Sequence, residues 1–456
     1  MCGIIGVHGV PEASSIVAYA LRALQHRGQE AAGIVSSDGK TLRRHRGQGL
    51  VEAVFRKINF SVELPGHSAV GQVRYSTAGD KANTESRRSI QPLMDDSRIL
   101  PLAIVHNGNL ENADELRLEL ERLGSICNSP SDTELFLHLI KRSHEDGLPE
   151  RLLDCFQQVK GAYTVLLLTP DRFYAAVDPH GFRPLCSAPF RGGVMFASEP
   201  CAFDLFRIPR EQVSYVEQGT LLEFVNPGLH PLVHRFGQGE SLRRCIFEWI
   251  YFARPDSSIW GGSVSRTRVR IGQLLAKRSP TPGADLVIPV PDSAIDHALG
   301  YAEESGLKYG HGFVRSHYIG RTFIEPIQTV RVDEIRMKLN PDPGVVADKR
   351  LVVVDDSIVR GNTSRQAVAL LREAGAKEIH LRIASPPVIH PCYWGIDTPT
   401  KEQLIAAVNP PNKIAELVGA DSVEYLTIED MFEAVGDPEG KRHCLTCFNC
   451  KHPTQP

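Results

Sequence analysis

The sequence lacks the features that would assign it to several specialised classes of protein. No apolar run approaches the roughly 20 residues of a membrane helix, and the N-terminus has no basic segment followed by a long apolar stretch, as a secretory signal would. There is no block of basic residues, and the formal net charge is −3. We therefore expect a globular protein of the cytoplasm that binds neither membranes nor nucleic acid.

The cysteines do not form the dense framework of a small disulfide-bonded secreted domain. There are 10 of them in 456 residues, and most are dispersed along the chain. Three lie together near the C-terminus, namely Cys444, Cys447 and Cys450. This distribution favours a reducing compartment in which some of the cysteines are catalytic or bind metal.

The pattern of apolar runs and turn signals predicts three parts. Residues 2–235 alternate short apolar runs with turns and contain few helical stretches, which predicts stacked sheets flanked by helices. Residues 236–400 begin with a Gly-bearing boundary and place apolar strands directly before helical patterns, as a parallel α/β sheet does. Residues 401–456 are predicted to be a helical tail that carries the clustered cysteines.

A cysteine occupies the second position, where removal of Met1 would expose both its thiol and its α-amine. The thiolate is the nucleophilic form of cysteine, and an α-amine with a pKa of about 8 can accept the thiol proton. Cys2 would then supply both nucleophile and base. On position alone, a chance cysteine in an apolar first strand explains the residue equally well.

An apolar strand at 351–354 runs into two adjacent carboxylates, Asp355 and Asp356, and then into a loop that enters a helix. Such a loop offers unpaired N–H groups to an anion, while the carboxylates can bind ribose hydroxyls or magnesium. The segment therefore predicts a sugar-phosphate site. It lacks the Gly-Lys-Ser/Thr of a Walker loop and the spaced glycines of a dinucleotide site. The plain alternative is a strand–turn–helix with solvated aspartates.

The segment 353–361 resembles the signature of type I phosphoribosyltransferases, and motifs along nearly the whole chain resemble the glutamine phosphoribosylpyrophosphate amidotransferases. The resemblance implies an α+β N-terminal-nucleophile glutaminase domain, of the class II glutamine amidotransferase type, followed by an α/β type I phosphoribosyltransferase domain. It implies that Cys2 forms a glutamyl thioester and frees ammonia. The ammonia would follow a shielded path to phosphoribosyl pyrophosphate (PRPP) and give 5-phosphoribosylamine and pyrophosphate, the first committed step of purine synthesis.

Partners and one alternative follow from the same resemblance. The family is homo-oligomeric, commonly tetrameric, and is inhibited by purine nucleotides. The alternative is a purine-responsive regulatory protein with a non-catalytic phosphoribosyl-binding fold. Such a regulator would not need Cys2 together with the glutamine-binding residues described next.

The resemblance assigns glutamine-binding roles to two motifs. In the motif at 72–77, Arg74 would pair with the α-carboxylate of glutamine through its two-pronged guanidinium, assisted by Thr77. Gln72 stands where family members commonly place histidine. Arg27, in an Arg-Gly turn, would help to hold the active-site loop, although a surface arginine at a helix end is the plainer interpretation.

Two further motifs would complete the glutaminase site. In His106-Asn107-Gly108-Asn109, the Asn107 side chain and the Gly108 N–H would stabilise the tetrahedral oxyanion. Asp132 would bind the α-amine of glutamine. Taken singly, Asn107-Gly108 is typical of a hairpin turn, and Asp132 is typical of a helix N-cap.

In the C-terminal half the resemblance implies a PRPP site with one magnesium ion per subunit. Ser293 would join Asp355 and Asp356 as magnesium ligands. A basic stretch at 318–340 would close over PRPP as a lid and expel water, with a solvated basic loop as the alternative. The implied PRPP-binding residues are Asp355, Asp356, Ser357, Arg360, Gly361, Asn362, Thr363 and, from the lid, Arg321.

Cys444 and Cys447 have the two-residue spacing of a common metal-ligating pair, and Cys245 and Cys392 can complete four sulfurs. Spacing alone does not separate tetrahedral zinc from a [4Fe–4S] cluster. The resemblance implies a [4Fe–4S] cluster on these four cysteines, as in one branch of the family. Cys450 could replace Cys447 or Cys392, and four uncoordinated buried thiols are the remaining alternative.

Overall fold

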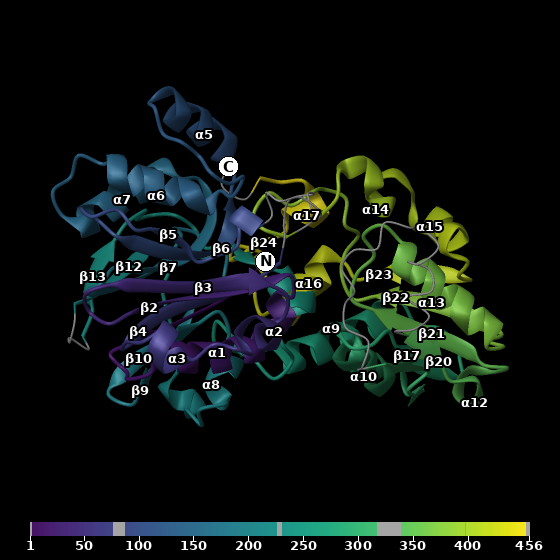
Figure 1. The fold of residues 1–456 in the computed structure, drawn as a ribbon. Coiled ribbons are helices and arrows are strands. Elements are labelled where there is room, and N and C mark those ends of the chain that lie inside the picture. Colours follow the sequence, from purple (N-terminus) through teal and green to yellow (C-terminus); the bar gives the residue numbers. More distant parts are fainter. Residues whose placement is uncertain (1, 76–86, 226–229, 317–338, 397, 453–456) are drawn as a thin grey trace. The chain divides into compact units, whose positions relative to one another are not determined.

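The computed structural model describes residues 2–75, 87–225, 230–316, 339–396 and 398–452 (Figure 1). The chain divides into two compact units. The first unit comprises Met1–Arg244, Ser257–Gly261 and Tyr393–Asp397, and the second comprises Cys245–Asp256, Gly262–Cys392 and Thr398–Pro456. Among the described helices, none combines the length and apolar character needed to span a bilayer.

The first unit is built on two antiparallel sheets. One has seven strands in the order β11-β9-β10-β1-β4-β2-β3, and the other has six in the order β13-β12-β8-β7-β6-β5. The strands of the first sheet are β1 (Gly3–His8), β2 (Ala31–Ser37), β3 (Leu42–Gln48), β4 (Ser68–Arg74), β9 (Cys186–Phe190), β10 (Gly193–Ala197) and β11 (Ser214–Tyr215). Those of the second are β5 (Leu93–Asp95), β6 (Leu102–Leu110), β7 (Gly161–Leu168), β8 (Arg172–Val177), β12 (Thr220–Val225) and β13 (Leu232–Arg235).

Apolar side chains from the inner faces of both sheets form one buried layer, to which Ile4 and Val70 contribute from one sheet and Val105 and Leu166 from the other. Helices cover the outer faces. The seven-stranded sheet packs against α1 (Ala13–Ala23), α2 (Val51–Phe55) and α8 (Cys201–Asp204), and the six-stranded sheet against α5 (Ala113–Arg122), α6 (Thr133–Arg142) and α7 (Leu148–Gln158). This arrangement confirms the predicted stacked sheets between helix layers.

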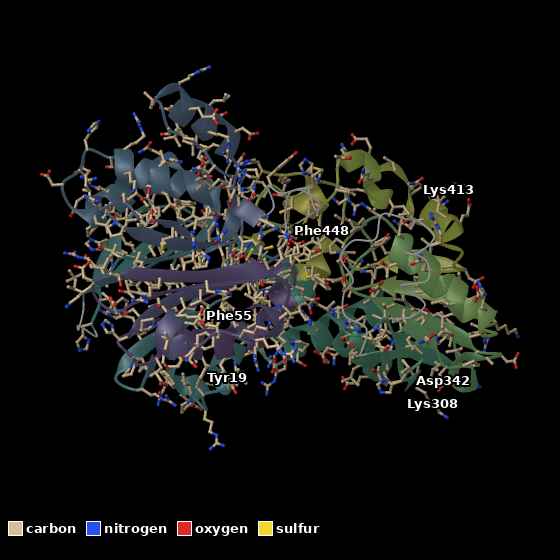
Figure 2. The ribbon with its side chains drawn as sticks, viewed as in Figure 1. Tyr19, Phe55, Lys308, Asp342, Lys413 and Phe448 are labelled. Carbon is tan, nitrogen blue, oxygen red and sulfur yellow. The ribbon has the colours of Figure 1, made fainter. Side chains whose placement is uncertain are left out.

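Each covering helix turns one face inward. Phe55 of α2 belongs to the core and is 7% exposed, whereas Tyr19 of α1 is 58% exposed; both are labelled in Figure 2. The remaining short helix of this region, α3 (Phe60–Glu63), packs beside them through Phe60.

Strand β1 brings the N-terminus into the middle of the seven-stranded sheet. It pairs with β4 on one side and β10 on the other, and all six of its residues are buried. Ile4 points into the layer between the sheets, while Ile5 points toward the helices. Because both faces of β1 are apolar, Cys2 is held at the end of a central strand.

The second unit contains a five-stranded parallel sheet in the order β18-β17-β21-β22-β23. This confirms the α/β sheet predicted for the C-terminal half. Its strands are β17 (Leu286–Pro289), β18 (Lys308–Tyr309), β21 (Arg350–Asp355), β22 (Glu378–Ile383) and β23 (Ser422–Tyr425). Its helices include α9 (Val264–Arg278), α10 (Ile295–Ser305), α12 (Pro343–Val346), α13 (Asn362–Glu373), α14 (Ile405–Val408), α15 (Pro411–Val418), α16 (Ile428–Ala434) and α17 (Thr446–Asn449).

Shorter elements complete the second unit. A π-helical segment, Glu248–Phe252, precedes α9, and two short strands, β19 (Phe313–Arg315) and β20 (Leu339–Pro341), pair antiparallel. Strands β14 (Arg244–Cys245) and β24 (His443–Cys444) form a two-stranded sheet. Since β23 and β24 both lie after residue 400, this region adds strands as well as helices to the fold.

Candidate active site

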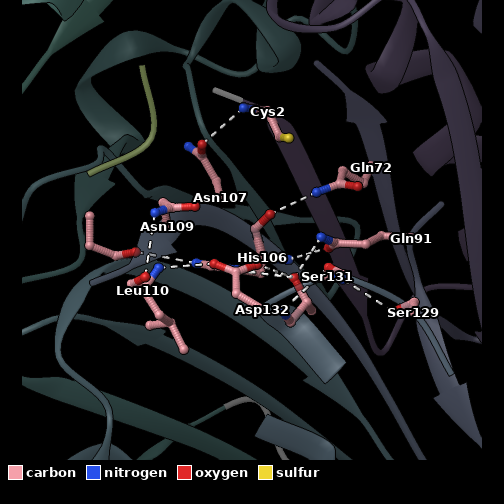
Figure 3. Close-up of polar contacts among 12 residues, drawn as sticks. Cys2, Gln72, Gln91, His106, Asn107, Asn109, Leu110, Ser129, Ser131 and Asp132 are labelled. Atoms are coloured by element: carbon pink, nitrogen blue, oxygen red, sulfur yellow. Dashed lines mark hydrogen bonds and ion pairs between the residues drawn. The ribbon is translucent and has the colours of Figure 1, made fainter. Parts of the chain in front are cut away.

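Cys2 is partly buried, and its backbone is held from two sides. Its N–H donates to Oδ1 of Asn107 at 3.0 Å (Figure 3), and its carbonyl oxygen accepts from Nε of Arg27 at 3.0 Å. The Sγ atom lies 3.8 Å from the carbonyl oxygen of Tyr75. The backbone of Cys2 is therefore held in place, and its N–H lies next to the side chain of Asn107 (Figure 3).

Asn107, which accepts from the Cys2 backbone, also carries a buried donor. While its Oδ1 accepts the Cys2 N–H, its Nδ2 is buried and has no hydrogen-bond partner among the described residues. Leaving such a donor unpaired costs about 1–3 kcal/mol. An oxyanion that accepted a hydrogen bond from Nδ2 would remove this cost.

Gly108 follows Asn107 with φ of 155°, and a Cβ at this position would lie 1.9 Å from the carbonyl oxygen of Ala162. Only glycine fits there. Both residues lie inside β6, where they pair with Thr164 and Tyr163 of β7. The hairpin turn that Asn-Gly typically indicates is therefore absent at this position, because the tertiary sheet overrides the local turn preference.

Asp132 precedes α6 in the N-cap position, yet its side chain does not cap the helix. Its Oδ2 accepts from the N–H of Leu110 at 2.9 Å, and its Oδ1 lies 3.7 Å from Nδ1 of His106. Burial would raise the pKa of Asp132, but the charge and hydrogen bonding of His106 and the backbone donors outweigh burial and lower the pKa below its ordinary value. The carboxylate is thus ionised and faces the strand that carries Asn107 (Figure 3).

A polar network fixes His106. Its Nδ1 lies 3.1 Å from Oγ1 of Thr133, its Nε2 lies 3.2 Å from the carbonyl oxygen of Ala162, and its N–H donates to Oε1 of Gln91 at 2.6 Å. Gln72 is also buried, and its Nε2 donates to the His106 carbonyl oxygen at 2.7 Å. Gln72, which lies on β4 of the seven-stranded sheet, therefore supports β6 of the other sheet through this hydrogen bond.

Arg27 is completely buried, so the interpretation as a surface arginine is wrong. Its Nη1 donates to Oε1 of Glu199, a carboxylate that is also fully buried. Gly28 lets this turn approach β4 closely, because a Cβ there would lie 2.5 Å from the carbonyl carbon of Arg74. Arg74 ends β4, next to the start of β1, and Thr77 lies outside the described residues.

The second predicted site lies at the carboxyl end of β21. Asp355 and Asp356 are both buried, and Asp356 accepts hydrogen bonds from the hydroxyls of Ser293 and Ser357. Burial and then the negative charge of Asp356 raise the pKa of Asp355 well above its ordinary value. A cation between the carboxylates would relieve this repulsion.

The loop that follows has the form of an anion site. Gly361 takes the left-handed conformation, with φ of 78°, directly before α13. Asn362 and Thr363 are exposed in the first turn of that helix, where backbone N–H groups lack helical partners. Arg360 is exposed, with Nε 3.3 Å from Oε1 of Gln403. Arg321 and most of the stretch around it lie outside the described residues.

The four predicted metal-binding cysteines lie near one another in the second unit. Burial, followed by the charge of Cys245, raises the pKa of Cys444 to about 12. Burial, followed by Cys444, Cys392 and Cys245, raises the pKa of Cys447 further. The backbone N–H groups of Ile389 and His390 donate to the Cys447 carbonyl oxygen at 2.8 and 3.2 Å and bring Cys392 toward it.

This cysteine region is packed but does not have the geometry of a bound metal. Phe448, labelled in Figure 2, packs on Phe247 with ring centroids 5.4 Å apart. Within the described ranges, no group of three or more His, Cys, Asp or Glu side chains is arranged to hold a metal ion. Cys450 is exposed, whereas the other cysteines of the cluster are buried or partly buried.

Comparison with known proteins identifies the family. A family model described as a glutamine amidotransferase domain matches residues 80–204. The amidophosphoribosyltransferase of Bacillus subtilis is 44% identical to the chain and is aligned over 100% of the chain and 94% of the relative. The chain belongs to the amidophosphoribosyltransferase family. The family member from Methanocaldococcus jannaschii is 41% identical, with 100% of the chain and 98% of the relative aligned.

A solved structure agrees with this membership. The structure of the B. subtilis glutamine PRPP amidotransferase, complexed with ADP and GMP, aligns with a TM-score of 0.91 and 43% identity over 100% of the chain and 98% of that chain. The amidophosphoribosyltransferase assignment confirms the predicted fold class, a glutaminase domain followed by a phosphoribosyltransferase domain.

Among amidophosphoribosyltransferase residues near Cys2, sequence reasoning missed Glu199. This residue follows β10 in the ordinary-looking run Ser198-Glu199-Pro200. Only the fold brings it to Arg27, 172 positions away. No local pattern in the sequence could have indicated that contact.

Proposed function

We propose that the protein transfers ammonia from glutamine to PRPP and yields 5-phosphoribosylamine, pyrophosphate and glutamate, the first committed step of purine synthesis. The observation that carries this proposal is the arrangement around Cys2, whose N–H donates to Oδ1 of Asn107, while the Nδ2 donor of Asn107 is buried and unpaired among the described residues. A purine-responsive regulator without catalysis would have no use for that donor.

In the glutaminase half, the Cys2 thiol attacks the side-chain carbonyl of glutamine, and the α-amine exposed by removal of Met1 takes the thiol proton. Asn107 Nδ2 and the Gly108 N–H donate to the oxyanion, and loss of one such donor typically costs about 2.7–4 kcal/mol. As the intermediate collapses, the α-ammonium of Cys2 returns the proton to the leaving nitrogen, the C–N bond breaks and ammonia is released. Water then hydrolyses the thioester to glutamate and regenerates the thiol.

The substrate glutamine is held by its two charged ends. Arg74, with Thr77, pairs with the α-carboxylate. Asp132 pairs with the α-ammonium, and its lowered pKa supports this role because the carboxylate is charged across the neutral range. Arg27 holds the Cys2 carbonyl oxygen.

In the transferase half, ammonia attacks C1 of the ribose and the C1–O bond to pyrophosphate breaks. Asp355 and Asp356 bind the ribose hydroxyls, and the 5′-phosphate lies over the start of α13. The residues proposed for the phosphate are Ser357, Arg360, Gly361, Asn362 and Thr363, with Arg321 closing over the pyrophosphate.

Asp355, Asp356 and Ser293 are the proposed holders of magnesium. Oxygen ligands suit this ion, and the raised pKa of Asp355 supports the fit, because two adjacent buried carboxylates call for a cation. Bound magnesium would neutralise charge on the carboxylates and on the leaving pyrophosphate.

Cys245, Cys392, Cys444 and Cys447 are the proposed ligands of a [4Fe–4S] cluster. Their mutual effect on the thiol pKa values of Cys444 and Cys447 supports a shared site, and thiolates are the ligands that such a cluster requires. The group would tie the C-terminal segment to the rest of its unit. The exposure of Cys450 makes it the weaker candidate ligand.

Other properties of the family extend the proposal. Purine nucleotides are the proposed inhibitors, supported by the ADP and GMP in the B. subtilis enzyme. A homotetramer in the cytoplasm is the proposed state, and residues 2–235, 236–400 and 401–456 are the proposed glutaminase domain, transferase domain and tail.

The first test is pyrophosphate release from PRPP and magnesium by anaerobically purified protein. We expect release with glutamine that is abolished by a glutamine-analogue alkylating agent and restored by ammonia. Release with neither nitrogen donor, from protein with a free Cys2 amine, would contradict the transferase assignment and leave the phosphate loop as a binding site.

A further inference from the structure

A buried polar chain runs away from the nucleophile to a residue far along the sequence. The Cys2 carbonyl oxygen accepts from Nε of Arg27, whose Nη1 donates to Oε1 of Glu199. The other carboxylate oxygen, Oε2, accepts from Oγ of Ser257 at 2.7 Å. Arg27 and Glu199 have no exposed surface, and Ser257 is 1% exposed.

Glu199 is fully occupied by donors. Besides Arg27 and Ser257, His26 Nε2 lies 2.7 Å from Oε1, and Cys201 Sγ lies 3.8 Å from Oε2. Burial would raise the pKa of Glu199, but the charges and hydrogen bonds of His26 and Arg27 outweigh it and hold the pKa below its ordinary range. A buried carboxylate persists in a fold only when it is paired in this way.

Ser257 belongs to a short segment of the first unit that follows the long range Met1–Arg244 in the sequence. Residues Ser257–Gly261 lie in the first unit, although the residues directly before and after them lie in the second. Within the first unit, the hydroxyl of Tyr215 donates to the Ser258 carbonyl oxygen at 2.6 Å, and Ile259 is fully buried. The position of Ser257 is therefore fixed by its neighbours.

Removal of Met1 makes this chain of contacts important for Cys2. A terminal residue has no preceding peptide to restrain it, and chain termini are poorly ordered unless tied down. The remaining backbone anchors of Cys2 are then its amine, at Asn107, and its carbonyl, at Arg27. A guanidinium on a flexible stem holds a carbonyl only if its other nitrogens are fixed.

We propose that Glu199 and Ser257 are positioning residues for the cleavage of glutamine. Ser257 orients the Glu199 carboxylate, which locks the Arg27 guanidinium against the Cys2 carbonyl oxygen and so aims the thiol. Neither residue touches the substrate. The inference rests on the proposed function, which it deepens by making the glutaminase site depend on a segment that follows residue 244.

The test uses the full-length protein and compares Glu199→Gln and Ser257→Ala with two matched controls. Glu223→Gln changes another buried, ion-paired glutamate, and Ser36→Ala removes another buried hydroxyl, both within the same unit and outside this chain of contacts. The primary readout is the rate at which a glutamine-analogue alkylating agent modifies Cys2. Glutamine-dependent kcat and KM and ammonia-dependent pyrophosphate release are measured in parallel.

We expect Glu199→Gln to slow alkylation and to lower glutamine-dependent kcat by on the order of 10²-fold, since small misplacements of a reacting group have effects of that size. Ser257→Ala should lower both rates by roughly tenfold, and the double variant should fall no further than Glu199→Gln, because the two residues act through one path. KM for glutamine and the ammonia-dependent rate should stay near wild type, as should both controls.

Alkylation of both variants at the wild-type rate would overturn the inference, as would additive effects in the double variant. If Glu199→Gln loses ammonia-dependent activity through misfolding, the milder Ser257→Ala decides by the same criteria. Failure of the wild-type protein to release pyrophosphate at all would instead contradict the proposed function, while the alkylation rates would still report on Cys2.

Discussion

The two candidate sites of this protein are built on opposite electrostatic principles. Around Cys2, buried charged groups have complementary partners in the protein: Arg27 pairs with Glu199, and Asp132 accepts from the N–H of Leu110. At the end of β21, the carboxylates of Asp355 and Asp356 lie side by side, and burial and then the negative charge of Asp356 raise the pKa of Asp355. The first site is organised by contacts within the protein, whereas at the second site we expect a bound cation to relieve the repulsion between the carboxylates.

Cys2→Ala should produce the largest difference between the activities of the two sites. Removal of a nucleophile eliminates the covalent path, so glutamine-dependent pyrophosphate release should fall by roughly 10⁴-fold or more. Ammonia-dependent release should remain within about twofold of wild type, because the phosphate loop belongs to the second unit. Equal loss with both nitrogen donors would show that the sites do not work separately.

Asp355→Asn changes the second site instead of the first. Loss of one carboxylate should lower pyrophosphate release with either nitrogen donor by on the order of 10²–10³-fold, the range seen when one preorganised electrostatic group is removed. The free energy of unfolding of the metal-free protein should rise, because the variant removes one of two adjacent buried carboxylates. Activity assays and thermal unfolding without magnesium measure the two effects.

The pH dependence of that stability has a definite sign. Because the folded pKa of Asp355 is raised, the folded state binds more protons than the unfolded state between the two pKa values. Stability without magnesium should therefore fall as pH rises from the ordinary aspartate pKa through the raised one. Asp355→Asn should flatten this fall, and an unchanged slope would show that a group other than Asp355 is responsible for it.

Asn107→Ala should affect only glutamine chemistry, and less than the loss of the nucleophile. Removing the buried Nδ2 donor should lower glutamine-dependent kcat by about 10²–10³-fold, with ammonia-dependent release preserved. Asn109→Ala is the matched control, since it changes the next asparagine of β6, whose Nδ2 donates instead to the Tyr393 carbonyl oxygen at 2.8 Å. If Asn109→Ala lowered kcat as much as Asn107→Ala, the effect could not be assigned to the buried Nδ2 donor of Asn107.

The same contrast explains what could be predicted from the sequence. Cys2, Asn107 and Asp355 lie in short motifs whose chemistry is visible in a few consecutive residues. Glu199 and Ser257 were invisible because their roles come from contacts 172 and 58 positions apart. A local boundary signal at residue 236 likewise could not reveal that Ser257–Gly261 and Tyr393–Asp397 join the first unit.

Local patterns were also misleading where tertiary structure competes with them. Asn107-Gly108 favours a hairpin turn, yet a nine-residue strand runs through it, because β7 pairs along its whole length. Asp132 occupies an N-cap position, but its carboxylate turns to Leu110 and His106. In both cases the residue is used by the site rather than by the local element, as expected where sequence rules fail at functional positions.

At the cysteines, Cys447→Ser and Cys450→Ser form a matched pair three residues apart. Burial and then three neighbouring cysteines raise the pKa of the Cys447 thiol, so its loss should abolish iron binding and the visible absorbance of anaerobically purified protein. Cys450 is exposed, and its loss should leave both unchanged. A cluster is held by thiolates, and serine does not supply one. Loss of absorbance in Cys450→Ser but not in Cys447→Ser would therefore show that Cys450, and not Cys447, is the fourth ligand.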